Sequence, residues 1–193
     1  DLSYWSSAMT STSVRLFSQD EYHRMKEAGS LDPDERVELL EGQIISMAPK
    51  NPPHSATNLC AAEYLRTLLP GLALIRIQDP INLNLYSEPE PDIAVVRIDP
   101  RFYIESHPTP ADTFLIVEIS DTTLERDRKQ KAVAYAKAGI ADYWILDTNT
   151  RQVRVFREIV NQTYQQEIIL NEEATLFMLA FPDIEVKIAQ LFP

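Results

Sequence analysis

Three short, almost uninterrupted apolar runs constrain the fold of this chain most strongly. They cover residues 92–97 (DIAVVR), 114–119 (FLIVEI) and 143–146 (YWIL). Runs of this length without polar alternation are typical of strands that are buried on both faces of a sheet. We therefore expect an α/β or α+β fold, in which helices flank a mixed β-sheet.

The segments between these runs carry helix, turn and strand signals. Ser18 and Glu21 form a capping box, which predicts a helix over 18–28 that ends at Gly29. Further helical segments are expected over 33–41 (ending at Gly42), 54–69, 125–138 (ending at Gly139) and 186–192. Further strands are expected over 43–47, on both sides of a turn at Asp79-Pro80 within 74–86, and in a hairpin of 153–157 and 164–170.

The length and the composition exclude several classes of protein. The 193 residues suit one domain, which we expect over 9–193, with residues 1–8 as a tag or a disordered start ahead of Met9. Cys60 is the only cysteine, which excludes an internal disulfide and a cysteine-based zinc site. The four glycines form no phosphate-binding loop, so no nucleotide cofactor is expected. No apolar run approaches the ~18–20 residues of a membrane span and no secretion signal is evident, so we expect a cytoplasmic protein.

The charge of the chain limits how it could bind nucleic acid. With 18 basic and 29 acidic residues, the formal net charge is −11. Such a surface argues against non-specific binding over the whole molecule but leaves room for a local basic cleft. The most basic stretch is 121–131, and its basic residues are Arg126, Arg128, Lys129 and Lys131.

Two carboxylates interrupt the apolar runs. Asp92 follows Pro91 and opens the first run, and Glu118 lies within the second, between Val117 and Ile119. Burial of a carboxylate in a central strand is costly unless a cation offsets it. Two such acids on neighbouring strands could share one divalent ion, because Mg²⁺ prefers oxygen ligands. The alternative is that both lie at strand ends and reach water or a cation of the protein.

The helix expected after Glu118 could bring an amine to these carboxylates. Asp127, Lys131 and Tyr135 follow at intervals of four residues and share one face, and Tyr135 is expected to pack over the Glu118 strand. Lys131 therefore leans toward the sheet, where its ammonium could offset negative charge that develops on a phosphate. The alternatives are a surface ion pair of Asp127 with Lys131, worth ~0.3–0.5 kcal/mol, and base stacking for Tyr135.

Six motifs occur in order along most of the chain. They are 37–42 (VELLEG), 91–96 (PDIAVV), 117–120 (VEIS), 127–139 (DRKQKAVAYAKAG), 143–147 (YWILD) and 179–184 (LAFPDI). Together they resemble the Uma-type restriction endonuclease family, a branch of the restriction-endonuclease-like superfamily, over residues 14–193. Within them, Pro91-Asp92 and 118–120 are similar to the PD-(D/E)xK nuclease signature, with Ser120 in the place of its lysine.

The resemblance implies a restriction-endonuclease-like mixed sheet flanked by helices, with an added C-terminal β-hairpin. It also implies metal-dependent hydrolysis of phosphodiester bonds, with Asp92, Glu118 and the backbone carbonyl of Ile119 as ligands of Mg²⁺ or Mn²⁺. Glu38 matches an assisting acid on the first core helix, with Glu41 as the weaker candidate. Lys131 matches a signature lysine that has migrated from the strand to the following helix.

Three further residues are candidates for substrate binding. Ser120 faces the same side of its strand as Glu118 but cannot act as a cation. Arg128 belongs to the basic stretch, and His54 opens the helix expected over 54–69. A histidine at a helix start more often serves as a cap or surface group, and that alternative stays open for His54.

The leading hypothesis is a Mg²⁺-dependent DNA endonuclease. By analogy with restriction enzymes we expect a homodimer, with the hairpin near 153–170 as a candidate interface. One alternative is a nuclease-fold binding or regulatory module with weak or lost cleavage, which Ser120 and the acidic composition favour. Another is a nuclease that acts on RNA or branched DNA.

Overall fold

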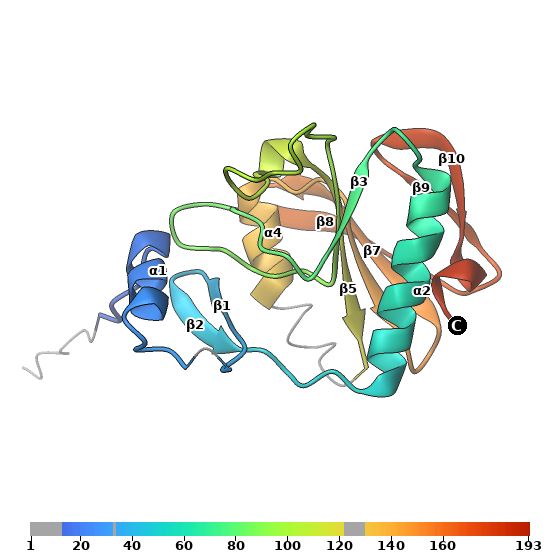
Figure 1. Cartoon of the computed structure of the whole chain (residues 1–193). Helices are drawn as coiled ribbons and strands as arrows, with labels where there is room; N and C mark the ends of the chain where they lie inside the picture. Colours follow the sequence, from blue (N-terminus) through green and yellow to red (C-terminus); the bar gives the residue numbers. More distant parts are fainter. Residues whose placement is uncertain (1–12, 33, 122–129) are drawn as a thin grey trace, which may run out of the picture.

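A six-stranded mixed sheet forms the centre of the computed structural model, which describes residues 13–32, 34–121 and 130–193 (Figure 1). In chain order its strands are β3 (Leu74–Ile77), β4 (Ile93–Val96), β5 (Thr113–Ser120), β6 (Tyr143–Asp147), β7 (Gln152–Val160) and β8 (Thr163–Leu170). They are arranged side by side in this same order, and only the β5–β6 pair is parallel. The expected mixed sheet is confirmed, and the three apolar runs form β4, β5 and β6 at its centre.

Helices and two small hairpins surround this sheet. Helix α2 (Pro52–Leu68) and helix α4 (Ala132–Ala138) lie on opposite sides of it (Figure 1). The other elements are α1 (Gln19–Glu27), β1 (Val37–Leu40), β2 (Gln43–Ser46), η1 (Pro110–Asp112), β9 (Thr175–Met178), β10 (Phe181–Lys187) and η3 (Ile188–Leu191). No helix in the described ranges is both long and apolar enough to cross a bilayer.

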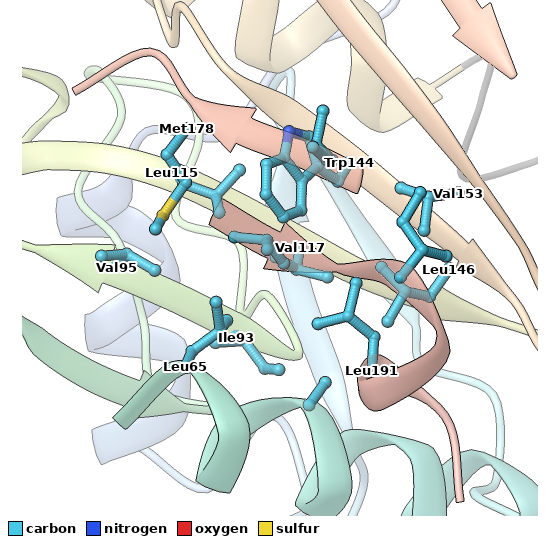
Figure 2. Close-up of a cluster of buried hydrophobic side chains, with 14 of the residues drawn as sticks. Leu65, Ile93, Val95, Leu115, Val117, Trp144, Leu146, Val153, Met178 and Leu191 are labelled. Atoms are coloured by element: carbon cyan, nitrogen blue, oxygen red, sulfur yellow. The ribbon is translucent and has the colours of Figure 1, made fainter. Parts of the chain in front are cut away.

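The larger hydrophobic core lies between the sheet and α2 (Figure 2). Ile93 and Val95 of β4 and Leu115 and Val117 of β5 are fully buried there with Leu65 of α2. These four residues of β4 and β5 are all odd-numbered. Because successive side chains of a strand point to opposite faces, the even-numbered side chains of β4 and β5 point to the α4 side.

The α4 side holds the second core. Ala94 and Ile116 pack there with Ala134 and Tyr135 of α4. Glu118 continues the even-numbered series of β5 and consequently projects among the α4 side chains.

The largest departure from expectation concerns residues 33–41, which do not form a helix. Residues 37–40 form strand β1, which pairs antiparallel with β2. Glu41 and Gly42 both have positive φ values, 50° and 76°, and they link Leu40 to its partner Gln43 as a two-residue hairpin turn. The acidic residues that begin 33–41 resemble a helix start, and Gly42 resembles a helix end. In the structure Gly42 instead lies in the hairpin turn. Glu38 therefore lies on a strand, and its expected place on the first core helix is wrong.

Most of the other expected elements are confirmed. The helix over 18–28 has its capping box, and the segments expected over 43–47, 54–69 and 153–170 form β2, α2 and the β7–β8 hairpin. The expected strand after Asp79-Pro80 is absent from the described sheet, since β3 ends at Ile77. Residues 125–129 of the helix expected over 125–138 lie outside the described part, and α4 ends before Gly139 as expected. The β9–β10 hairpin was not expected.

Candidate active site

The register of three neighbouring strands brings Gln78, Asp92 and Glu118 into one row. Ile93 pairs with Val117 across β4 and β5, so the preceding residue, Asp92, lies opposite Glu118. Ile77 pairs with Ile93 across β3 and β4, which places Gln78 next to Asp92 on its other side. The two carboxylates thus come from adjacent segments at one end of the sheet.

Asp92 is held by hydrogen bonds from three separate segments. Its Oδ2 accepts from the backbone N–H of Ile119 at 2.8 Å and lies 3.1 Å from Nε2 of His54, and its Oδ1 accepts from Nε2 of Gln78 at 3.1 Å. Burial by itself would raise the pKa of the Asp92 carboxyl, but the hydrogen bond and charge of His54 and the Ile119 N–H hold this pKa below its usual value. The surroundings therefore favour the ionised form, which is the form that binds a cation.

Lys131 lies between two buried glutamates. Its Nζ donates to Oε1 of Glu118 at 2.9 Å and lies 3.3 Å from Oε1 of Glu38. Only 3% of Glu118, 2% of Glu38 and 6% of Lys131 is exposed. Each buried ion loses several kcal/mol of hydration free energy. The positive charge of Lys131 offsets this loss for the two carboxylates. Lys131 is thus buried on the sheet side of its helix, and its other expected partner, Asp127, lies outside the described residues.

Tyr135, one helical turn after Lys131, contacts the same carboxylate. Its Oη donates to Oε1 of Glu118 at 2.7 Å, and its ring is fully buried. Burial and the negative charge of Glu118 raise the pKa of Tyr135 well above its usual value, so the hydroxyl remains a donor. The expected packing over the Glu118 strand is confirmed, and full burial excludes the base-stacking alternative.

Asp92, Glu118, Glu38 and Lys131 line one cavity of about 50 Å³. Its wall is formed by Arg36, Glu38, Met47, Ala48, Pro49, Lys50, His54, Glu90, Asp92, Glu118, Ile119, Asp121 and Lys131. Because a water needs roughly 10–15 Å³ of such space, the cavity has room for an ion and a few waters. In its buried part, three carboxylates (Glu38, Asp92 and Glu118) against the single ammonium of Lys131 leave a net charge of −2 when all are ionised.

Comparisons with known proteins identify the family. The family Uma2, described as "Putative restriction endonuclease", matches residues 19–189. The chain belongs to the Uma2 family. The resemblance stated from the six motifs is thereby confirmed, and the family indicates a nuclease of the restriction-endonuclease-like kind, which generally uses divalent metal ions.

A solved structure shares the fold of this Uma2 member. It is described as a "putative nuclease belonging to DUF820" from Anabaena variabilis, and it aligns with a TM-score of 0.70 at 18% sequence identity. The alignment covers 91% of this chain and 97% of that chain, so the likeness extends over the whole fold. No curated protein matches the chain.

The donor groups of the cavity fit a small divalent cation. Asp92 and Glu118 supply carboxylate oxygens, and the net charge of −2 is the charge that such an ion neutralises. Continuing the β4–β5 register places Pro91 opposite Ile119, and proline has no N–H to donate to the Ile119 carbonyl. In the described ranges no three His, Cys, Asp or Glu side chains form a metal cluster, so this set depends on that carbonyl and on water.

The three substrate-binding candidates have different positions. His54 lies in the cavity wall, and its Nδ1 is buried without a hydrogen-bond partner. Ser120 is fully buried, its Oγ also has no partner, and it is not among the residues that line the cavity. Arg128 lies outside the described residues, as do Arg126 and Lys129.

Sequence reasoning missed two contacts of this site. Gln78 was assigned to the approach to a turn, yet its amide holds Asp92 and its backbone adopts a φ of 55°. Tyr135 was expected only to pack, although its spacing of four residues from Lys131 already placed both side chains on one helical face. The sequence carried no comparable signal for Gln78, because its place beside Asp92 follows from the strand register.

Proposed function

We propose that this protein is a divalent-metal-dependent endonuclease that hydrolyses phosphodiester bonds of DNA in the cavity around Asp92 and Glu118. The observation that carries the proposal is the pairing of these two buried carboxylates with the ammonium of Lys131 at one end of the sheet. A structural ion pair alone would need one carboxylate for the lysine. Here three carboxylates share the site with a single lysine.

Asp92, Glu118 and the Ile119 carbonyl would hold the ion, Mg²⁺ or Mn²⁺. When bound, such an ion supplies Lewis-acid activation of water and neutralisation of phosphate charge. The task of the protein is to keep the ligands ionised and oriented. Gln78 and His54 orient Asp92, and Tyr135 orients Glu118 through Oε1.

Lys131 and Glu38 would act beside these ligands. The Lys131 ammonium can stabilise the negative charge that develops on the phosphate oxygens, which a serine at position 120 cannot do. Glu38 accepts the Glu90 backbone N–H through Oε2 and contacts Lys131 through Oε1, so it positions the lysine. His54 contacts Asp92 through Nε2 and its Nδ1 is buried, so His54, like Ser120 and Arg128, remains a weaker candidate for substrate contact.

The alternative of a non-catalytic binding module relied on the missing lysine at position 120. The burial of Lys131 against Glu118 favours the nuclease, because an amine is supplied from α4 instead. RNA and branched DNA remain alternative substrates and belong to the same test.

Cleavage assays test the proposal. Supercoiled plasmid, single-stranded DNA, branched DNA and RNA are incubated with Mg²⁺ or Mn²⁺ and with wild type, Asp92→Ala, Glu118→Ala or Lys131→Ala. We expect metal-dependent cleavage that each substitution reduces by at least ~10²-fold, since the first two remove a ligand of the ion and the third removes the ammonium that would act on the phosphate. Glu172→Ala, which removes an exposed carboxylate paired with Arg151, serves as the control and should cleave normally. Cleavage that survives in Asp92→Ala would contradict the proposal.

We also propose a homodimer, with the β7–β8 hairpin at its interface. Strand β8 lies at the edge of the six-stranded sheet, where its backbone groups can pair with a second strand, and Ile168 and Ile169 are exposed on it. Light scattering should give twice the chain mass of 22.1 kDa. A mass of one chain at micromolar concentration would contradict the dimer.

A further inference from the structure

Two cations in the wall of the active-site cavity have no part in the chemistry proposed above. Arg36 directly precedes β1, and Lys50 directly precedes Asn51, the N-cap of α2. The β1–β2 hairpin brings them together, because Met47 donates its backbone N–H to the Arg36 carbonyl at 2.8 Å and Lys50 follows three residues later. Both side chains therefore border the same opening, next to Asp92 and Glu90.

Neither cation has a carboxylate partner within ion-pair distance among the described residues. Within the described ranges, the Arg36 side chain makes a single weak hydrogen bond, 3.9 Å from its Nη2 to the Met47 sulfur. By contrast Arg101 and Arg157 are paired with Glu105 and Asp142. In a chain with 29 acidic and 18 basic residues, Arg36 and Lys50 thus place two cations without such partners at one opening.

The two cations also oppose each other. Burial and the positive charge of Arg36 lower the pKa of Lys50, while Asp92 and Glu90 act in the opposite direction. Like charges that converge on one opening raise the energy of the folded chain, and an anion placed between them removes that cost. The arrangement is thus suited to an anionic ligand that enters the cavity.

We propose that Arg36 and Lys50 bind a phosphodiester group of the nucleic-acid strand adjacent to the one that is cleaved. This inference rests on the proposed nuclease function and adds the contacts that bring the strand to the site. A guanidinium can bind phosphate oxygens through two parallel hydrogen bonds, and an ammonium adds a point charge. With a net charge of −11, the chain needs such a local pair to hold a polyanion against its overall repulsion.

A second concavity adjoins the active-site cavity. It has a volume of about 360 Å³, and it shares Arg36 and Glu90 with the active-site cavity. Its wall holds Lys26 of α1 as a third cation but also the carboxylates of Asp32, Glu35 and Glu90. The proposed phosphate contacts are therefore limited to Arg36 and Lys50.

Binding measurements test the phosphate contacts separately from cleavage. The probe is a short fluorescein-labelled oligonucleotide of mixed sequence, single-stranded or duplex, followed by anisotropy with EDTA and again with Ca²⁺. Wild type is compared with Arg36→Gln, Lys50→Gln and the double variant between about 50 and 200 mM salt. The control variants Arg101→Gln and Lys187→Gln make the same chemical changes outside the cavity.

We expect each cavity variant to weaken binding by roughly three- to tenfold at low salt. The slope of log K against log salt should fall by about 0.9 for duplex or 0.7 for single strands per residue removed. The control variants should keep the affinity and slope of wild type, and no variant should have a lower Tm than wild type.

Unchanged affinity and slope in Arg36→Gln and Lys50→Gln, or no oligonucleotide binding by wild type under either condition, would overturn the inference. Failure of the nuclease proposal looks different. In that case wild type cleaves nothing, yet it binds the oligonucleotide in a way that depends on Arg36 and Lys50.

Discussion

At the scale of single residues, the notable feature is an amine that reaches the site from a helix. Ser120, two residues after Glu118, lies where the nuclease signature places its lysine, and its hydroxyl is buried without a partner. Lys131 instead reaches Glu118 from the residue before α4, and Glu38 binds it from the other side. The side chain of lysine is long and flexible, so its ammonium can reach the same place from the helix side as from the strand. In the proposed chemistry only the position of this charge matters to the phosphate.

Replacement of Lys131 by methionine should destabilise the fold strongly. The change leaves Glu118 and Glu38 buried without their shared cation, for which we expect a loss of about 3–5 kcal/mol in the free energy of unfolding. Urea denaturation at neutral pH measures it. Lys137→Met is the matched control in the same helix, since Lys137 pairs with Glu41 at the surface and such pairs contribute about 0–1 kcal/mol. Equal losses in the two variants would contradict the buried triad.

Removal of one hydroxyl should separate stability from catalysis. In Tyr135→Phe, Glu118 loses a donor while the packing of the ring remains, so we expect cleavage to fall by roughly tenfold and stability by about 1 kcal/mol. Tyr164→Phe is the control, because its hydroxyl donates to the Ile140 carbonyl away from the cavity at 2.6 Å. It should lose similar stability and keep full cleavage. An equal loss of cleavage in both variants would show that the Tyr135 hydroxyl has only a structural role.

At the scale of elements, the β1–β2 hairpin brings Glu38 to the site. Its turn needs positive φ at both central residues, and Gly42 provides one of them at low cost. A Cβ at Gly42 would also lie 2.5 Å from Cβ of Leu16. A larger residue there would therefore strain the turn and crowd Leu16.

Gly42→Ala should therefore reduce the free energy of unfolding by more than the backbone strain of a positive φ alone. Gly71→Ala is the matched control, since its φ of 71° is similar and an added Cβ would have no neighbour within 4 Å. We expect a loss of about 1 kcal/mol for Gly71→Ala and a clearly larger one for Gly42→Ala, because the Leu16 contact adds to the backbone strain. Thermal unfolding of both variants measures the difference. Equal losses would mean that Leu16 moves aside freely.

The elements also show where sequence reasoning succeeds. The continuous apolar runs identified β4, β5 and β6, because burial on both faces leaves no polar alternation. Residues 37–40 were taken for a helix, since a buried strand with one glutamate has no strand period and Glu41-Gly42 resembles a helix end. The charge of Glu38 is offset by Lys131, which is distant in sequence. An ion pair between residues far apart in the sequence leaves no local pattern in that sequence. The same holds for the position of Gln78 beside Asp92.

At the scale of the whole molecule, the acidic composition and the nuclease assignment are compatible. The net charge of −11 describes the total, whereas the cavity combines a buried excess of carboxylates with Arg36 and Lys50 at its opening. In the proposed nuclease, the carboxylates would attract a divalent ion, and the two cations would then attract the phosphate strand. Acidic surface elsewhere would restrict nucleic acid to this one face.

The central claim is that Asp92 and Glu118 hold a divalent ion together. Anomalous diffraction from a crystal soaked in Mn²⁺ tests it most directly, because manganese can be located without any assumption about activity. We expect one manganese peak in the cavity, bound by both carboxylates and the Ile119 carbonyl, and no such peak in Asp92→Ala. A cavity without manganese at saturating Mn²⁺, with Lys131 still between Glu38 and Glu118, would contradict the claim.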